Sequence, residues 1–272
     1  MKYSICNEMF EGWKLEDVFE FAAKTGYHGV ELAPFTFCES AYDLSKEERD
    51  KIRMAAERAG VEIVGLHWLL VSPKGLHINH PDPSVRERTR EYFKELVRLC
   101  ADLGGRVMVF GSPKERNVLE PLTFEQAWEY AKETFRECAE LAEEKGVVIC
   151  LEPLHRGQTN FINVPDEAVK MIEEVNRPAF KLILDVYSMS TEELDIPGEI
   201  RKHAKYLEHF HANDKNRRYP GSSGEVDYGP IIEALKEVGY KGYLSIEVFE
   251  FDPGPEFIAR EGLRYLKQLV EG

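Results

Sequence analysis

The sequence predicts an α/β protein folded as a single (β/α)8 TIM barrel that covers residues 1–272. Two observations predict this fold. Short β-branched runs alternate eight times with longer amphipathic stretches, which is the pattern of a parallel sheet whose strands are joined by helices. The chain length of 272 residues is also close to the roughly 250 of a typical barrel, and no linker or change in composition divides it.

The expected strands are short apolar runs, and each is followed by a helical stretch. The eight strands are expected at residues 3–6, 29–33, 61–67, 106–111, 147–152, 180–185, 206–211 and 243–248.

The expected helices carry recognisable end signals. The first begins near residue 14, and Gly26 is a suitable C-cap for it. Ser45 with Glu48 forms a capping box, and Thr123 opens a later helix with Gln126 three residues on. The other helices are expected at residues 45–59, 83–103, 123–145, 165–175, 197–203, 228–238 and 255–269.

Composition excludes several classes of function. With 35 basic and 49 acidic residues the net charge is −14, which argues against nucleic acid as a partner. The longest uncharged apolar stretch, residues 63–71, is too short to span a membrane, and the N-terminus lacks the apolar run of a signal peptide. Five cysteines without CxxC spacing indicate free thiols in a reducing cytoplasm.

Four residues of metal-ligand type occur at the C-terminal ends of the last four expected strands, one residue at each. These residues are Glu152, Asp185, His211 and Glu247. Strand ends meet at one mouth of a barrel, where active sites of this fold are built. A single acid at such a place is commonly part of a salt bridge or a helix cap, but four ligand-type residues at successive strand ends indicate one site. Three carboxylates and one imidazole favour Mn²⁺, Mg²⁺ or Co²⁺ over a structural zinc site.

Other histidines are more ambiguous. His67 ends the third strand and points at the mouth, which suits both a site residue and a packed histidine. His209 faces the same way as His211, because it lies two residues earlier on the same strand, and suits a layer inside the barrel. His77 and His80 lie in a polar loop and are expected to be solvated.

The candidate ligands suit proton transfer next to a carbonyl group. A divalent ion can chelate the carbonyl and hydroxyl oxygens of a hydroxyketone and stabilise the enediolate that forms when the α-proton leaves. Glu152 and Glu247 come from strands on opposite sides of part of the barrel. They can therefore take the proton from one face of the carbon and return it on the other.

Four segments carry a resemblance to a known family. They are LEPLHRGQT (151–159), LDVYSM (184–189), HFHANDKNRRYPGSSGEVD (209–227) and SIEVFEFDPGPE (245–256). On these segments the chain resembles the sugar phosphate isomerase/epimerase superfamily with the xylose isomerase-like barrel, over essentially its whole length. The similarity is greatest to ketose 3-epimerases of the tagatose/psicose type.

The resemblance implies roles for individual residues. The four candidate ligands would hold one divalent ion, usually Mn²⁺ or Co²⁺, and Glu152 and Glu247 would shuttle the proton. Arg217 matches an arginine that contacts sugar oxygens, and Phe249 matches an aromatic residue that lines the pocket. With the glycine-rich segment 219–224, Arg217 is expected to form a lid. The resemblance also implies a homodimer or homotetramer.

Two positions depart from the epimerase pattern. In the epimerases, the residues at both positions contact the substrate near its reacting end. This chain has Gln158 where the epimerases carry a second glutamate, and Ser188 where they carry a histidine. The metal and proton machinery is therefore expected, while the substrate is open: a ketose, a keto-glycoside, a cyclic ketone or a modified sugar.

Three other functions are weighed against a sugar isomerase or epimerase. A lyase similar to inosose dehydratases, or one that eliminates from keto-glycosides, would use the same proton abstraction and then expel a β-substituent. A DNA-repair endonuclease of the related barrel family would need a histidine-rich three-metal cluster, which this acidic chain does not offer. A binding protein without catalysis would not explain two carboxylates beside a metal.

Overall fold

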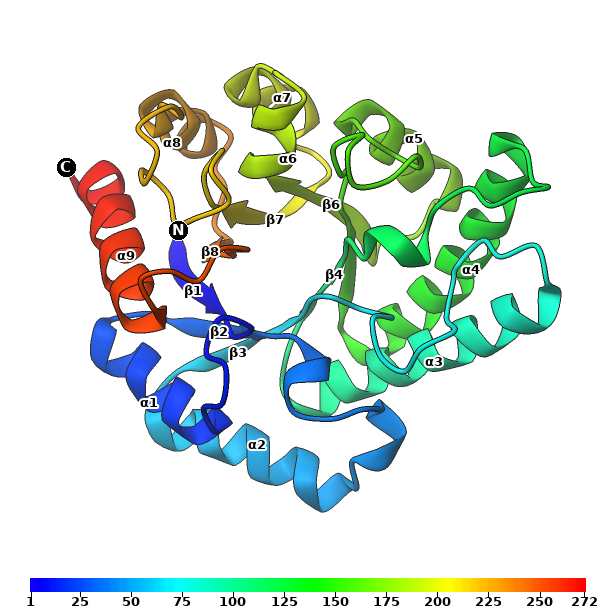
Figure 1. The fold of residues 1–272 in the computed structure, drawn as a ribbon, viewed down its shortest axis with the longest axis horizontal. Helices are drawn as coiled ribbons and strands as arrows, with labels where there is room; N and C mark the ends of the chain where they lie inside the picture. Colours follow the sequence, from blue (N-terminus) through cyan, green and yellow to red (C-terminus); the bar gives the residue numbers. More distant parts are fainter.

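Eight parallel strands close into a barrel in the computed structural model, which describes all of residues 1–272 (Figure 1). The strands follow one another around the barrel in chain order, and β1 pairs with β8 to close it. The strands are β1 Lys2–Cys6, β2 Gly29–Leu32, β3 Glu62–Leu66, β4 Val107–Phe110, β5 Val148–Leu151, β6 Phe180–Asp185, β7 Leu207–Ala212 and β8 Tyr243–Ile246. The predicted barrel and all eight predicted strands are confirmed.

The helices form an outer ring around the strands, and α9 lies against both α8 and α1 (Figure 1). None of them is both long and apolar enough to cross a bilayer. The helices are α1 Leu15–Thr25, α2 Lys46–Ala59, α3 Pro83–Asp102, α4 Phe124–Lys145, α5 Pro165–Val175, α6 Val186–Thr191, α7 Ile196–His203, α8 Tyr228–Glu237 and α9 Pro255–Glu271. The sequence did not predict α6, nor the short 3₁₀ helices at 34–36, 41–43 and 113–115.

Local signals begin and end these helices where the sequence predicted. Gly26 adopts a left-handed conformation with φ 100°, and its N–H donates to the carbonyls that end α1. Both capping boxes are present: the Ser45 side chain accepts from the Glu48 N–H, and that of Thr123 accepts from the Gln126 N–H.

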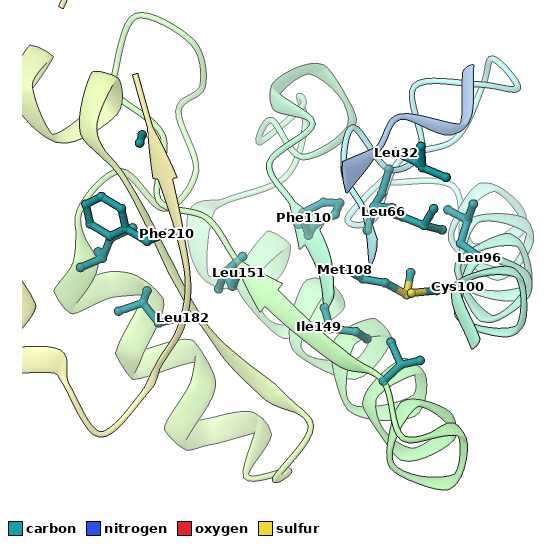
Figure 2. Packing of buried hydrophobic residues seen from close by; sticks show 14 of the residues in the cluster. Leu32, Leu66, Leu96, Cys100, Met108, Phe110, Ile149, Leu151, Leu182 and Phe210 are labelled. Atoms are coloured by element: carbon teal, nitrogen blue, oxygen red, sulfur yellow. The ribbon is translucent and has the colours of Figure 1, made fainter. Parts of the chain in front are cut away.

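The main hydrophobic core lies between the strands and the surrounding helices. Figure 2 shows Leu66 and Met108, from two neighbouring strands, packed against Leu96 and Cys100 of α3. Because side chains alternate along a strand, these outward residues leave the intervening positions to fill the barrel interior.

The barrel interior is divided into an apolar and a polar half. A small apolar cluster comes from the strands β3 to β6: Val64, Val107, Val109, Cys150 and Ile183. The strands β7, β8, β1 and β2 instead contribute buried polar side chains: His209, His211, Ser245, Ser4 and Glu31. The polar half is the part of the barrel that supports the candidate site.

Candidate active site

The structure brings the four predicted ligands together at the C-terminal mouth of the barrel. Glu152 directly follows β5, Asp185 ends β6, His211 lies in β7 and Glu247 directly follows β8. One ligand atom of each side chain lies within 4.8 Å of those of the other three, and all four residues are buried. We refer to these four residues as the carboxylate–histidine cluster, and they could hold one metal ion between them.

Neighbouring backbone and side chains hold two members of the cluster in place. Asp185 is the N-cap of α6, and its Oδ1 accepts from the Ser188 N–H at 2.7 Å. Its Oδ2 accepts from Asn213 Nδ2 at 2.6 Å. His211 Nδ1 lies 3.0 Å from Glu247 Oε2. The short helix α6 therefore begins because Asp185 caps it, and the cap in turn fixes the carboxylate.

The charges of the cluster suit a divalent cation. Burial, followed by the nearby carboxylates of Glu247 and Asp185, raises the pKa of Glu152 well above its usual range. Burial also raises the pKa of Asp185 and that of Glu247. Of these three carboxylates only Glu247 has an ion-pair partner, which is His211. A hard, oxygen-rich donor set with uncompensated negative charge fits a bound divalent ion.

A buried arginine, which sequence reasoning missed, supports the backbone of Glu152. The fully buried Arg116 donates from Nη1 to the carbonyls of Glu152 at 2.7 Å and Gly111 at 3.0 Å. Burial lowers the pKa of Arg116 to about 10. A Cβ at Gly111 would overlap Glu152 Oε2, so a glycine is needed for the carboxylate to approach the end of β4.

A hollow beside the cluster contains both glutamates and three of the predicted substrate contacts: Gln158, Ser188 and Phe249. Trp68, which the sequence did not single out, lines the hollow together with Phe249. The Trp68 ring lies 6.3 Å from that of Phe249, and the Tyr187 ring, outside the lining, lies 5.6 Å from it. An apolar wall facing a few polar groups is typical of a site for a small molecule. The lining residues are Trp68, Val109, Gly111, Ser112, Pro113, Glu152, Leu154, Gln158, Ser188, Glu247 and Phe249.

Arg217 lies at the rim, beside Phe249, and its side chain is half exposed. Its guanidinium lies 5.8 Å from the centre of the Phe249 ring, and its Nη1 lies 3.4 Å from Glu250 Oε1. The segment 219–224 packs against α9, where Tyr219 contacts Phe257, and none of its residues lines the hollow.

His67 lies deeper than the other predicted substrate contacts. It is fully buried, does not line the hollow, and its Nε2 lies 2.7 Å from Glu8 Oε2. Ligand atoms of Glu8, His67 and Glu247 lie within 4.8 Å of one another. Sequence reasoning missed Glu8, although an acid just after the first strand carries the same signal as the acids after later strands.

Comparison with known proteins gives a consistent result. The sequence matches the xylose isomerase-like TIM barrel family over residues 19–269. It is similar to a D-psicose 3-epimerase of Ruminiclostridium cellulolyticum, with 32% identity over 237 residues, or 85% of this chain and 76% of that protein. It is also similar to an L-ribulose 3-epimerase of Mesorhizobium japonicum, with 31% identity over 88% of this chain and 78% of the relative. The fold resembles the crystal structure of D-psicose 3-epimerase with D-tagatose from Clostridium cellulolyticum H10, with a TM-score of 0.87, 24% identity and 99% coverage of both chains.

Proposed function

The chain belongs to the xylose isomerase-like TIM barrel family, and on this basis we propose that it is a metal-dependent sugar epimerase or isomerase acting on a ketose or a related keto-sugar. One observation carries the proposal. Glu152 and Glu247 both line one hollow, and their carboxylates lie within 4.8 Å of the ligand atoms of Asp185 and His211.

The proposed cofactor is one divalent ion held by the carboxylate–histidine cluster. Mn²⁺ suits the oxygen-rich donor set best, and Co²⁺ or Mg²⁺ would also fit. When bound, such an ion would supply positive charge that stabilises the negative charge developing on the substrate as its proton leaves.

In the proposed mechanism the two glutamates act on opposite faces of one carbon. One carboxylate takes the proton from the carbon next to the carbonyl group, and the electron pair moves onto the carbonyl oxygen. The other glutamate, in its protonated form, returns a proton to the opposite face, which inverts that carbon. Walls of Trp68 and Phe249 would exclude water from the reacting atoms.

The remaining candidate contacts have different proposed roles, according to whether they line the hollow, lie at its rim or lie behind it. Gln158 and Ser188 line the hollow and would bind substrate hydroxyl groups, while Phe249 would pack against the apolar face of a sugar. Arg217 at the rim would contact sugar oxygens. His67 is buried behind the hollow, so its pairing with Glu8 favours a role in holding that carboxylate.

For the whole protein we propose a homodimer or homotetramer in the cytoplasm, in line with its family. All five cysteines are free thiols and four are buried, which fits a reducing compartment. Light scattering on the purified protein tests the assembly.

Substitution of each glutamate by glutamine tests the mechanism. Because glutamine keeps a coordinating oxygen but cannot accept the proton, Glu152→Gln and Glu247→Gln should each lower turnover by about 10²–10⁴-fold. The Mn²⁺ content, measured by elemental analysis, should stay near that of the wild type. Each variant should lose deuterium exchange from one epimer more than from the other. The exposed Glu256 on α9 provides the matched control, Glu256→Gln, which should turn over normally.

A lyase remains the second candidate, because Gln158 and Ser188 alter the region near the reacting end of the substrate. In that reaction one base removes the same proton, and the electron pair then expels a β-substituent, which takes up a proton from the protonated base and leaves as water or an alcohol. Equal, mild effects of the two substitutions at full metal occupancy would remove the two-base mechanism and favour the lyase.

A further inference from the structure

We propose that Glu31 is a positioning residue: it holds the Nε2–H of His211 and so presents Nδ1 of that ring to the metal. This inference rests on the proposed function, since it assigns a role toward the proposed ion. It adds a residue that lies outside the carboxylate–histidine cluster, on β2, on the other side of the His211 ring.

The contacts of Glu31 account for both of its oxygens. Its Oε1 lies 3.1 Å from His211 Nε2. Its Oε2 lies 2.8 Å from His209 Nε2 and accepts from Ser245 Oγ at 2.7 Å. Glu31 is fully buried, so these contacts are shielded from bulk solvent. A buried carboxylate is costly unless it is paired, and here three donors from β7 and β8 surround it.

The direction of these hydrogen bonds decides which nitrogen of His211 is free. An ionised carboxylate can only accept, so the Nε2 atoms facing Glu31 must both carry protons. The Ser245 hydroxyl donates to the same carboxylate, so all three of its close contacts fit a group that only accepts. The other nitrogen of His211, Nδ1, faces Glu247 Oε2 at 3.0 Å and would be the ligand atom for the proposed ion. A carboxylate behind a metal-binding imidazole fixes the ring and raises its basicity.

The strand pairing places Glu31 inside the barrel. The pairing of β2 with β1 is regular, with Cys6 opposite Glu31, and the extra residue in the shifted pairing with β3 is Val64, on β3. Side chains therefore alternate normally along β2, and Glu31 points to the interior, where it meets the two histidines of β7. His209 and His211 then face the same way as each other, because they are two residues apart on β7, and both reach the carboxylate.

The first test is the affinity for Mn²⁺, measured by calorimetric titration of metal-stripped protein, which needs no sugar substrate. Glu31→Gln keeps the shape but loses the charge, and Glu31→Leu removes the acceptor entirely. We expect Mn²⁺ to bind roughly 10-fold more weakly in the first and closer to 100-fold in the second. Glu256→Gln is the control, since it removes an exposed carboxylate on α9, and should bind Mn²⁺ within about 3-fold of wild type.

Affinities within 2-fold of wild type in both folded Glu31 variants would overturn the proposal. So would a wild type that binds two Mn²⁺ ions and a Glu31→Gln variant that binds one, because Glu31 would then be a ligand itself. If wild-type protein binds no Mn²⁺ at all, the proposed function fails, and the second test still decides the role of Glu31.

The second test locates the proton on the wild-type ring and depends on no variant. ¹⁵N NMR of histidine-labelled protein, with and without the diamagnetic probe Zn²⁺, distinguishes protonated from bare ring nitrogens. We expect His211 to carry a proton on Nε2 in both states, and its Nδ1 to carry no proton when Zn²⁺ is bound. An unprotonated Nε2 on His211 would contradict the proposal.

Discussion

At the scale of single residues, the surroundings of each buried glutamate decide its chemistry. Glu31 faces three donors and is held ionised, with its pKa well below the usual range. Glu152 has no such donors and faces Glu247 and Asp185, so burial and those charges raise its pKa. The first environment suits a fixed structural anion, and the second suits a group that takes part in metal binding and proton transfer.

Arg217 provides a test of the rim of the site. Removing its side chain should take away a charge-assisted hydrogen bond to the substrate, worth about 1.5–3 kcal/mol. Arg217→Ala should therefore lower kcat/KM by roughly 10–100-fold on the true substrate, while the bound metal stays constant. Arg218→Ala, a change at the neighbouring position, is the control for local disturbance. Unchanged kcat/KM in Arg217→Ala would exclude a substrate contact.

His77 provides a test of stability against pH. The expectation that it is solvated is wrong: the residue is buried and neither ring nitrogen has a hydrogen-bond partner. Burial, with a smaller effect of nearby His80, lowers the pKa of His77 to about 4. Because the unfolded pKa is about 6.5, unfolded chains bind more protons between these values. The contribution of neutral His77 is thus complete above pH 6.5 and is lost as the pH falls toward 4.

We therefore expect His77→Phe to lose less thermal stability than wild type between pH 7 and pH 4.5, as measured by Tm across this range. The phenyl ring fills similar space and cannot be protonated. His28→Gln, a change at an exposed histidine, serves as the control and should keep the wild-type slope. A His77→Phe variant whose Tm falls as steeply as that of wild type would show that this histidine does not drive the acid sensitivity.

At the scale of elements, the regular strands and helices were predictable because periodicity and end signals agree along the chain. The helix α6 was missed because its six residues, VYSMST, include poor helix formers and are too few to show a period. Its start depends on the cap by Asp185, whose more conspicuous role is in the cluster.

The four members of the cluster could be predicted because each stands at the end of a strand. Glu31 was missed although it lies one residue before the end of β2, as His211 does in β7, so the same strand-end signal could have found it. Arg116 was missed for a different reason. A lone arginine in a loop usually indicates the surface, and only the tertiary structure surrounds it with carbonyl groups.

Gly65 tests how closely the strands β3 and β4 approach. A Cβ at this position would overlap the carbonyl oxygen of Val107, which is backbone and cannot move away without breaking the barrel pairing. Gly65→Ala should therefore lower the free energy of unfolding by about 3 kcal/mol or more, measured by urea denaturation. Gly229→Ala, in the first turn of α8, is the control and should change it by less than about 1 kcal/mol. Equal, small effects would show that the strands can separate locally.

At the scale of the whole molecule, the barrel divides its interior between stability and function. The strands β3 to β6 fill their side with apolar residues, while β7, β8, β1 and β2 hold buried polar groups beneath the mouth. Such a division concentrates the cost of buried charge in one region, directly behind the site that uses it.

Metal loading should stabilise the entire barrel, because the proposed ion joins residues from four successive strand ends. A ligand at 100 times its Kd stabilises the folded state by about 2.7 kcal/mol, which corresponds to a Tm increase of roughly 5–10 °C for a domain of this size. Calorimetry with and without Mn²⁺ should show this shift in wild type and not in Asp185→Asn. No shift in wild type at saturating Mn²⁺ would argue against a site formed by the folded barrel.

The proposed reaction of this barrel removes a proton from a carbon next to a carbonyl group and returns it on the other face. ¹H NMR in D₂O with Mn²⁺-loaded enzyme, followed by removal of the metal before acquisition, tests it on a panel of ketoses and 3-keto-glycosides. We expect at least one substrate to gain deuterium at one carbon as its epimer forms, with no group released. Protein kept free of metal should show neither exchange nor epimer formation. Release of water or an alcohol would indicate the lyase, and metal-loaded enzyme that exchanges no proton in any of these sugars would contradict the proposed function.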